Sequence, residues 1–132
     1  MSTIGLDTTV VIRLLVGLPA SQFAVARRRL ARAVDAGDTV LVSDVVATEA
    51  YFALQHHYEV PKVEARTLLR QLLHSGTVQL DPKGALEALD EAAGAGLVDR
   101  LIHGRYQSLG ASTLTFERKQ GALPGAERLS ES

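Results

Sequence analysis

Short apolar runs rich in β-branched residues alternate with longer amphipathic segments along most of this chain. The short runs occupy residues 3–6, 39–42, 78–80 and 111–116, and residues 126–129, after Pro124-Gly125, are expected as a last edge strand. Strands separated by helices favour a parallel sheet with helices packed on both faces. We therefore predict an α/β fold built as a three-layer sandwich around a central, mostly parallel sheet. Ligands of such folds bind beyond the carboxyl ends of the strands.

The predicted helices are bounded by residues that commonly begin or end helices. Helices are expected over 8–16, 21–36, 44–57, 61–74, 84–93 and 97–109, with a short segment at 118–121. Ser21 and Ser43 are candidate N-caps, because a serine oxygen accepts bonds from free backbone N–H groups. Gly37 and Gly76 follow two of the helices and can adopt the left-handed conformation that ends them.

The size of the chain predicts one folded domain. It has 132 residues, of which 46% are hydrophobic and 22% are charged. This length fits one domain, and the charged fraction is too low for a disordered chain. We expect one domain over 1–132, with 130–132 as a flexible tail. The formal net charge is −1, so any nucleic-acid binding requires a local basic patch.

Several classes of protein are excluded by what the sequence lacks. There is no cysteine, which excludes disulfides, zinc ribbons and thiol nucleophiles. No run approaches the roughly 20 apolar residues of a membrane span, and the first residues do not form a signal peptide. We therefore expect a cytoplasmic protein that does not enter a membrane.

Most of the acidic residues lie in predicted turns, tails or solvated faces. These are Asp35, Asp38, Glu59, Glu64, Glu87, Asp90, Glu91, Glu127 and Glu131. Asp44 is predicted in the first turn of a helix, where its charge favours the helix dipole, and Asp81 precedes a proline in a turn.

Four acids occupy more unusual positions. Asp7 and Glu117 directly follow the first and fourth predicted strands, and Asp99 opens the helix at 97–109. Glu49 is predicted to share a helical face with apolar side chains, where an unpaired carboxylate is costly. Each also has an ordinary explanation: a helix cap for Asp7, a boundary position for Glu49, a first-turn acid for Asp99 and a solvated loop for Glu117.

Taken together, the four acids suggest a metal site. A parallel sheet brings such positions to its carboxyl edge, where clustered carboxylates repel one another unless cations neutralise them. Oxygen ligands suit Mg²⁺ or Mn²⁺, and such an ion can activate water and stabilise charge on a phosphodiester. The choice between one ion and two stays open.

Five short motifs, in order, resemble those of the PIN domain, and specifically those of the VapC-type toxin ribonucleases of bacterial toxin–antitoxin pairs. They are Ile4-Gly5-Leu6-Asp7-Thr8-Thr9-Val10, Val45-Val46-Ala47-Thr48-Glu49, Asp99-Arg100-Leu101-Ile102, Leu114-Thr115-Phe116-Glu117-Arg118-Lys119 and Leu123-Pro124-Gly125-Ala126. The resemblance extends from Ile4 to about Leu129. Each motif is short, and the specificity comes from their order and spacing.

The resemblance implies a Mg²⁺-dependent endoribonuclease, with Mn²⁺ as a possible substitute, in which metal-activated water cuts RNA internally. Asp7, Glu49, Asp99 and Glu117 would be the catalytic and metal-site residues, and Thr9 and Thr115 would be accessory. The resemblance also implies a VapB-type antitoxin, whose C-terminal segment wraps the toxin and blocks the site, and a homodimer.

The chain departs from the family pattern at several of these positions. The family usually has Asp where Glu117 stands, and often Asn or Ser where Thr9 stands. Small residues usually follow the third acid, whereas this chain has Arg100, His103 and Arg105. Glu117 and Arg100 therefore keep open an alternative, a catalytically impaired PIN-like module that binds RNA or a protein partner.

Basic residues offer candidates for phosphate contact. Arg13, Arg118 and Lys119 lie closest in sequence to the four acids. The cluster of Arg27, Arg28, Arg29 and Arg32 is a solvated helix face, an RNA contact or an antitoxin contact. His56, His57 and His74 are expected as cations at helix C-termini. His103 lies one turn after Asp99 and is expected at the surface or behind the site.

Other phosphoryl-transfer folds fit less well. A haloacid-dehalogenase-type site requires a second Asp two residues after the first, where this chain has Thr9. A phospho-receiver domain requires an acidic pair at its first strand and a later strand-end Lys, and neither is evident. Walker-type glycine loops and Gly-x-Ser-x-Gly nucleophile elbows are also absent.

Overall fold

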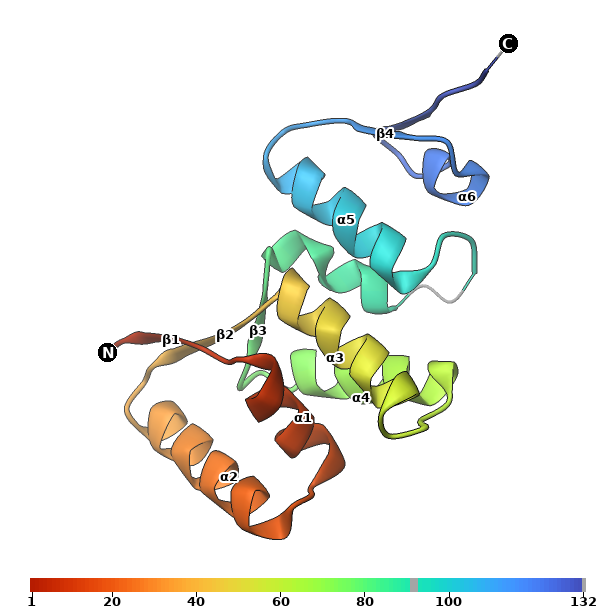
Figure 1. The fold of residues 1–132 in the computed structure, drawn as a ribbon. Helices are drawn as coiled ribbons and strands as arrows, with labels where there is room; N and C mark the ends of the chain where they lie inside the picture. Colours follow the sequence, from red (N-terminus) through yellow and green to blue (C-terminus); the bar gives the residue numbers. More distant parts are fainter. Residues whose placement is uncertain (91–92, 132) are drawn as a thin grey trace. The chain divides into compact units, whose positions relative to one another are not determined.

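A computed structural model describes residues 1–90 and 93–131 and divides them between two compact units (Figure 1). The first unit is Met1–Asp81 and the second is Pro82–Ser132. Glu91, expected as a solvated acid, and Ser132, the last residue of the expected tail, lie outside the described residues. The helix expected over 84–93 also extends into the part that is not described.

The first unit contains a three-stranded parallel sheet. Its strands are β1 (Thr3–Gly5), β2 (Thr39–Ser43) and β3 (Gln79–Asp81), in the order β1-β2-β3. Ile4 aligns with Val40, and Val42 aligns with Leu80. Val40, Val42 and Leu80 are buried. Because the strands are parallel, their carboxyl ends lie along one edge of the sheet.

Four helices complete this unit. They are α1 (Thr8–Val16), α2 (Ala20–Asp35), α3 (Asp44–His56) and α4 (Lys62–Leu73). Helix α1 packs against α2 and α3, and α3 packs against α4 and β2. Val11, Ala47, Ala50, Leu54 and Leu69 are fully buried and form the centre of the core.

Capping explains where most of these helices begin and end. The Ser43 hydroxyl accepts a bond from the Val46 N–H at 3.1 Å, as predicted for an N-cap. Gly17 ends α1 in the left-handed conformation, with φ at 78°. The prediction for Ser21 was wrong, because α2 begins at Ala20 and its N-cap is Pro19.

The described residues of the second unit form a two-stranded parallel sheet, two α-helices and a 3₁₀-helix. Its elements are η1 (Lys83–Leu89), α5 (Leu97–Ser108), β4 (Thr113–Thr115), α6 (Arg118–Gly121) and β5 (Ala126–Arg128). The 3₁₀-helix η1 replaces the α-helix predicted over 84–93. Helix α5 packs closely on η1 at Gly104, where an added Cβ would lie only 2.9 Å from the Ala85 Cβ.

The α/β class and the parallel pairing are therefore confirmed, since every strand pair in the described part of the chain is parallel. The β4 and β5 strands are shorter than the ranges expected for them. No single helix among residues 1–90 and 93–131 is long and apolar enough to cross a membrane. Helices α1 and α2 reach that length and composition only together, across a bend of 108°.

Candidate active site

Asp7 lies where β1 leads into α1, and its carboxylate is available to a ligand. The residue is the N-cap of α1, with φ −77° and ψ 163°, yet its side chain makes no capping bond. The exposed carboxylate receives one long hydrogen bond, from the Thr9 hydroxyl to Oδ2 at 3.4 Å. The explanation of Asp7 as a side-chain cap is therefore wrong.

Thr8, beside Asp7, is a residue that sequence reasoning missed. Its hydroxyl oxygen is buried and has no hydrogen-bond partner among the described residues. A buried hydroxyl without a partner is costly, and such atoms are often completed by water or by an ion. The start of α1 thus combines the exposed Asp7 carboxylate with the unpartnered Thr8 hydroxyl.

Glu49 lies on α3 and is exposed, so the prediction that it faces inward was wrong. The buried face of α3 is formed by Ala47, Ala50, Tyr51 and Leu54. Glu49 lies on another face. On the helix, neighbouring positions point about 100° apart, so a residue next to the buried Ala50 can still be exposed.

Asp99 is the third residue of α5 and is half-buried. Its backbone carbonyl accepts a bond from the Gln120 side-chain amide at 3.1 Å. The next residue, Arg100, donates from Nε to the Ala95 carbonyl at 2.9 Å and from Nη2 to the Ala93 carbonyl at 2.7 Å. The arginine that departs from the family pattern therefore anchors the loop that precedes α5.

Glu117 precedes α6 and is exposed, and its side chain makes no capping bond. Its backbone N–H donates to the Thr115 hydroxyl at 3.0 Å. Thr115 therefore fixes the turn between β4 and α6, and its hydroxyl hydrogen is still free to donate. This exposure agrees with the solvated-loop explanation of Glu117 and also leaves its carboxylate open to a ligand.

Gln120 connects the elements that carry Asp99 and Glu117. It is buried, with 6% of its surface exposed, and lies on α6 three residues after Glu117. Its bond to the Asp99 carbonyl holds α6 against the first turn of α5. Sequence reasoning missed it, because one polar residue in a four-residue helix carries no recognisable signal.

His103 is buried rather than at the surface, with 5% exposed. Its Nε2 lies 2.7 Å from the Pro124 carbonyl, and its Nδ1 lies 2.7 Å from the Thr113 hydroxyl. A carbonyl can only accept, so Nε2 donates, and in the neutral ring Nδ1 accepts from Thr113. Gln107 donates to the same Pro124 carbonyl at 3.0 Å. These bonds tie α5 to β4 and to the closing turn.

The basic candidates differ in their surroundings. Arg13 donates from Nε to Gln22 at 2.5 Å and from Nη1 to the Tyr58 hydroxyl at 3.3 Å. It therefore bridges α1, α2 and the segment after α3. Arg118 and Lys119 are exposed at the start of α6, directly after Glu117, so these two can approach a phosphate more freely than Arg13.

The four predicted acids are divided equally between the two units. Asp7 and Glu49 belong to the first, and Asp99 and Glu117 belong to the second. Within the described residues, no three His, Asp or Glu side chains form a group that could hold a metal ion. The donor chemistry still fits a hard cation, since these acids offer carboxylate oxygens, the ligands that Mg²⁺ and Mn²⁺ prefer.

A comparison with protein families matches residues 4–125 to the PIN domain. The chain belongs to the PIN domain family. The match includes all four acids and extends across both units. PIN domains are generally nucleases and typically use divalent metals. A search of curated proteins found no match.

Proposed function

We propose that this PIN domain is a Mg²⁺-dependent endoribonuclease and the toxin of a VapBC-type toxin–antitoxin pair. The observation that carries the proposal is the exposed Asp7 carboxylate at the end of β1, which makes no capping bond. The family match supports a nuclease, and the order of the other motif acids supports the toxin assignment.

In this proposal the four acids hold the metal. Asp7, Glu49, Asp99 and Glu117 bind Mg²⁺, or Mn²⁺ in its place, directly or through water. When bound, such an ion would supply activation of water and stabilisation of charge on the phosphodiester. We also propose that the chain is a single domain over residues 1–132. The family match across residues 4–125 supports a single domain.

The neighbouring side chains position the acids and the substrate. Thr9 donates to the Asp7 carboxylate and restricts its rotation. Thr115 fixes the backbone of Glu117. The exposed Arg118 is better placed than Arg13 to contact an RNA phosphate. Arg13 donates hydrogen bonds to Gln22 and Tyr58. A contact between Arg13 and a phosphate must therefore use its remaining N–H groups.

The partners follow from the toxin assignment. We propose that a VapB-type antitoxin binds the protein and blocks the site, that two copies form a homodimer, and that the protein acts in the cytoplasm. The genes beside the one that encodes this protein provide a simple test of the antitoxin proposal. A toxin of this type is expected to be encoded beside a small antitoxin, and expression without that neighbour should arrest growth.

Cleavage of pooled cellular RNA tests the proposed activity. The purified protein is assayed with Mg²⁺ or Mn²⁺, with EDTA, and as the Asp7→Asn and Asp35→Asn variants. Asp35 is an exposed acid at the end of α2 and serves as the matched control. We expect metal-dependent cutting that Asp7→Asn abolishes and Asp35→Asn retains.

Other outcomes would count against the proposal. Cutting that persists equally in EDTA and in Asp7→Asn would refute the assignment of the site. No cutting of any RNA by the folded, antitoxin-free protein would favour the catalytically impaired module instead.

A further inference from the structure

Helix α3 carries an exposed stripe of which the candidate active site uses only Glu49. The stripe is formed by Val45, Glu49, Phe52 and His56, which are spaced by four, three and four residues and so share one face of the helix. Val45 has 64% of its surface exposed and Phe52 has 44%, and Glu49 and His56 are also exposed. The buried residues of α3 lie on another face, so the stripe is directed away from the core of the first unit.

Two rings of the stripe are stacked beside the acid. The Phe52 ring centroid lies 6.2 Å from that of His56, with an interplanar angle of 24°. On its other side the ring lies 5.8 Å from the ring of Tyr51, which is buried, so Phe52 rests against the core there. Phe52 follows Glu49 by three residues, and side chains at this spacing have Cβ atoms about 5–6 Å apart. An exposed aromatic ring with fixed neighbours therefore stands within one helical turn of a proposed metal ligand.

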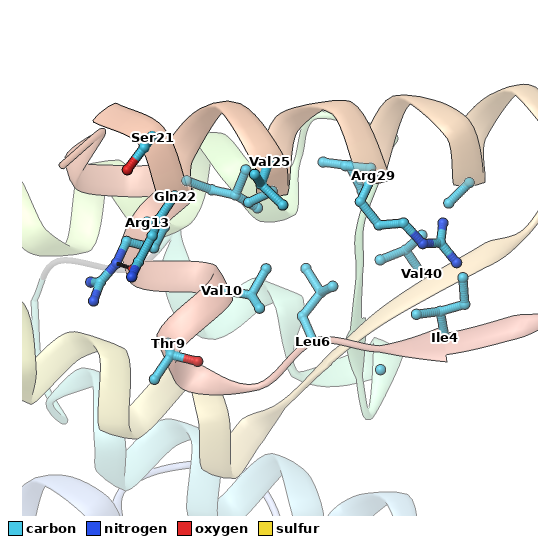
Figure 2. A pocket seen from close by; sticks show the side chains of 15 residues that line it. Ile4, Leu6, Thr9, Val10, Arg13, Ser21, Gln22, Val25, Arg29 and Val40 are labelled. Atoms are coloured by element: carbon cyan, nitrogen blue, oxygen red, sulfur yellow. Dashed lines mark hydrogen bonds between the residues drawn. The ribbon is translucent and has the colours of Figure 1, made fainter. Parts of the chain in front are cut away.

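A guanidinium group is held close to the segment that follows α3. Arg13 of α1 donates from Nη1 to the Tyr58 hydroxyl at 3.3 Å, and Tyr58 comes two residues after the end of α3. Figure 2 shows Arg13 beside Gln22, which accepts a bond from its Nε. An arginine has five N–H donors, so these two bonds fix the side chain and leave donors for a phosphate. This surface therefore combines a carboxylate, a flat ring and a fixed cation.

We propose that Phe52 is an RNA-binding residue, on whose ring a base of the single-stranded substrate stacks next to the phosphodiester at Glu49. The inference rests on the proposed function and adds to it a residue that holds the substrate. Aromatic rings bind single-stranded nucleic acid by base stacking, and all four bases are accepted because each has a π face. The base extends the Phe52–His56 stack, and a phosphate of the same strand is bound by Arg13.

The stripe suits RNA better than a second copy of the chain. In a two-fold symmetric dimer the same surface of each copy meets across the axis. The α3 stripes would then bring two Glu49 carboxylates into one apolar contact, where unpaired charges are costly. A stacked base covers only the aromatic ring and leaves Glu49 open to a metal ion. Stacking distinguishes the bases weakly, so we expect this contact to hold the strand more than to select its sequence.

Binding of short RNA strands that contain 2-aminopurine tests the contact, because the fluorescence of this base analogue falls when it stacks on an aromatic ring. The strands are about eight nucleotides long, and each carries the analogue at a different position. Affinity and quenching are measured with the intact protein in Ca²⁺, and cleavage is measured separately in Mg²⁺. The oligomeric state of every variant is determined by analytical ultracentrifugation.

Substitutions at two positions on either side of Glu49 separate stacking from general apolar contact. Phe52→Leu removes the ring and keeps an apolar side chain, and we expect it to weaken RNA binding about tenfold, to raise KM by a similar factor with little change in kcat, and to abolish the quenching. Val45→Ala removes exposed apolar surface one turn before Glu49 and should change affinity less than about twofold. The chain has no tryptophan, so Phe52→Trp adds a single indole, whose fluorescence unmodified RNA should quench far more than that of Val45→Trp.

Several results would overturn the proposal. These are full affinity and quenching in Phe52→Leu, equal losses in Val45→Ala, or equal quenching of Phe52→Trp and Val45→Trp, a comparison that needs no result from Phe52→Leu if that variant fails to fold. A Phe52→Leu variant that loses self-association together with RNA binding would assign the stripe to a second copy. Binding and quenching without Mg²⁺-dependent cleavage would refute the proposed function alone. Cleavage with a KM unchanged in Phe52→Leu would refute the stacking proposal alone.

Discussion

The hydrogen bonds of His103 are expected to be a main source of stability in the second unit. The side chain is 5% exposed, and both of its ring nitrogens are bonded at 2.7 Å. In His103→Leu, the bond to the Pro124 carbonyl is lost, which is worth about 0.5–1.5 kcal/mol. The Thr113 hydroxyl is also left buried without this partner, which costs about 1–3 kcal/mol. The Pro124 carbonyl still accepts from Gln107, so we expect a total loss of roughly 3 kcal/mol.

A double-mutant cycle isolates the bond between His103 and Thr113. Thr113→Val removes the hydroxyl at nearly constant shape and is expected to cost about 1–2 kcal/mol alone. In the His103→Leu background the same change should cost less, with a coupling energy of about 1 kcal/mol. The chain has no tryptophan, so unfolding in urea is followed by circular dichroism.

The exposed His57 provides the control for this cycle. His57→Leu should change the free energy of unfolding by less than about 0.5 kcal/mol. Additive effects of His103→Leu and Thr113→Val, or a His103→Leu variant as stable as His57→Leu, would refute the role given to this bond.

Three further predictions concern other contacts. A Cβ at Gly121 would lie 2.6 Å from the Arg128 Cβ, so Gly121→Ala should lower the free energy of unfolding by about 1–3 kcal/mol. Gly84 has open space around it, so Gly84→Ala should be nearly neutral. Equal effects of the two substitutions would contradict this prediction. Gln120→Leu should weaken Mn²⁺ binding about tenfold by releasing α6 from Asp99, and unchanged affinity would exclude a positioning role. Burial raises the pKa of the Tyr51 hydroxyl above its ordinary value of 10.0, although Arg66 opposes the shift. The stability that the protonated Tyr51 contributes is therefore complete below pH 10 and is lost as pH rises through the folded-state pKa. The latest phase of an absorbance titration of the tyrosines should be missing in Tyr51→Phe.

The sequence predicted those parts of the fold that depend on local pattern. Short apolar and β-branched runs located β1, β2, β3 and β4, and the cap at Ser43 follows from one serine before a helix. The strand β5 contains no β-branched residue and was expected only from its place after Pro124-Gly125. The prediction for 84–93 failed because i to i+3 bonds, such as that from the Ala85 N–H to the Pro82 carbonyl, form a 3₁₀-helix instead. Short segments of this kind differ little from α-helices in their sequence pattern.

The site was less predictable, because side-chain exposure depends on distant partners. Apolar residues occur on several faces of α3, where Val45 and Phe52 are exposed, so periodicity alone misplaced Glu49. His103 is buried by a turn that is 21 residues away in the sequence. Thr8 and Gln120 acquire their surroundings only in the folded chain. The motif acids were found through their order along the chain, and their convergence on one metal remains a proposal.

The central proposal, that Asp7, Glu49, Asp99 and Glu117 hold a divalent metal, is tested most directly by Mn²⁺ binding measured by calorimetry. Asp7→Asn and Asp99→Asn are compared with wild type, with the double variant, and with Asp35→Asn as the control. A shared site predicts that either single change abolishes the same binding event and that the double variant loses nothing more. Two independent losses, or Mn²⁺ binding retained in both single variants, would contradict the shared site.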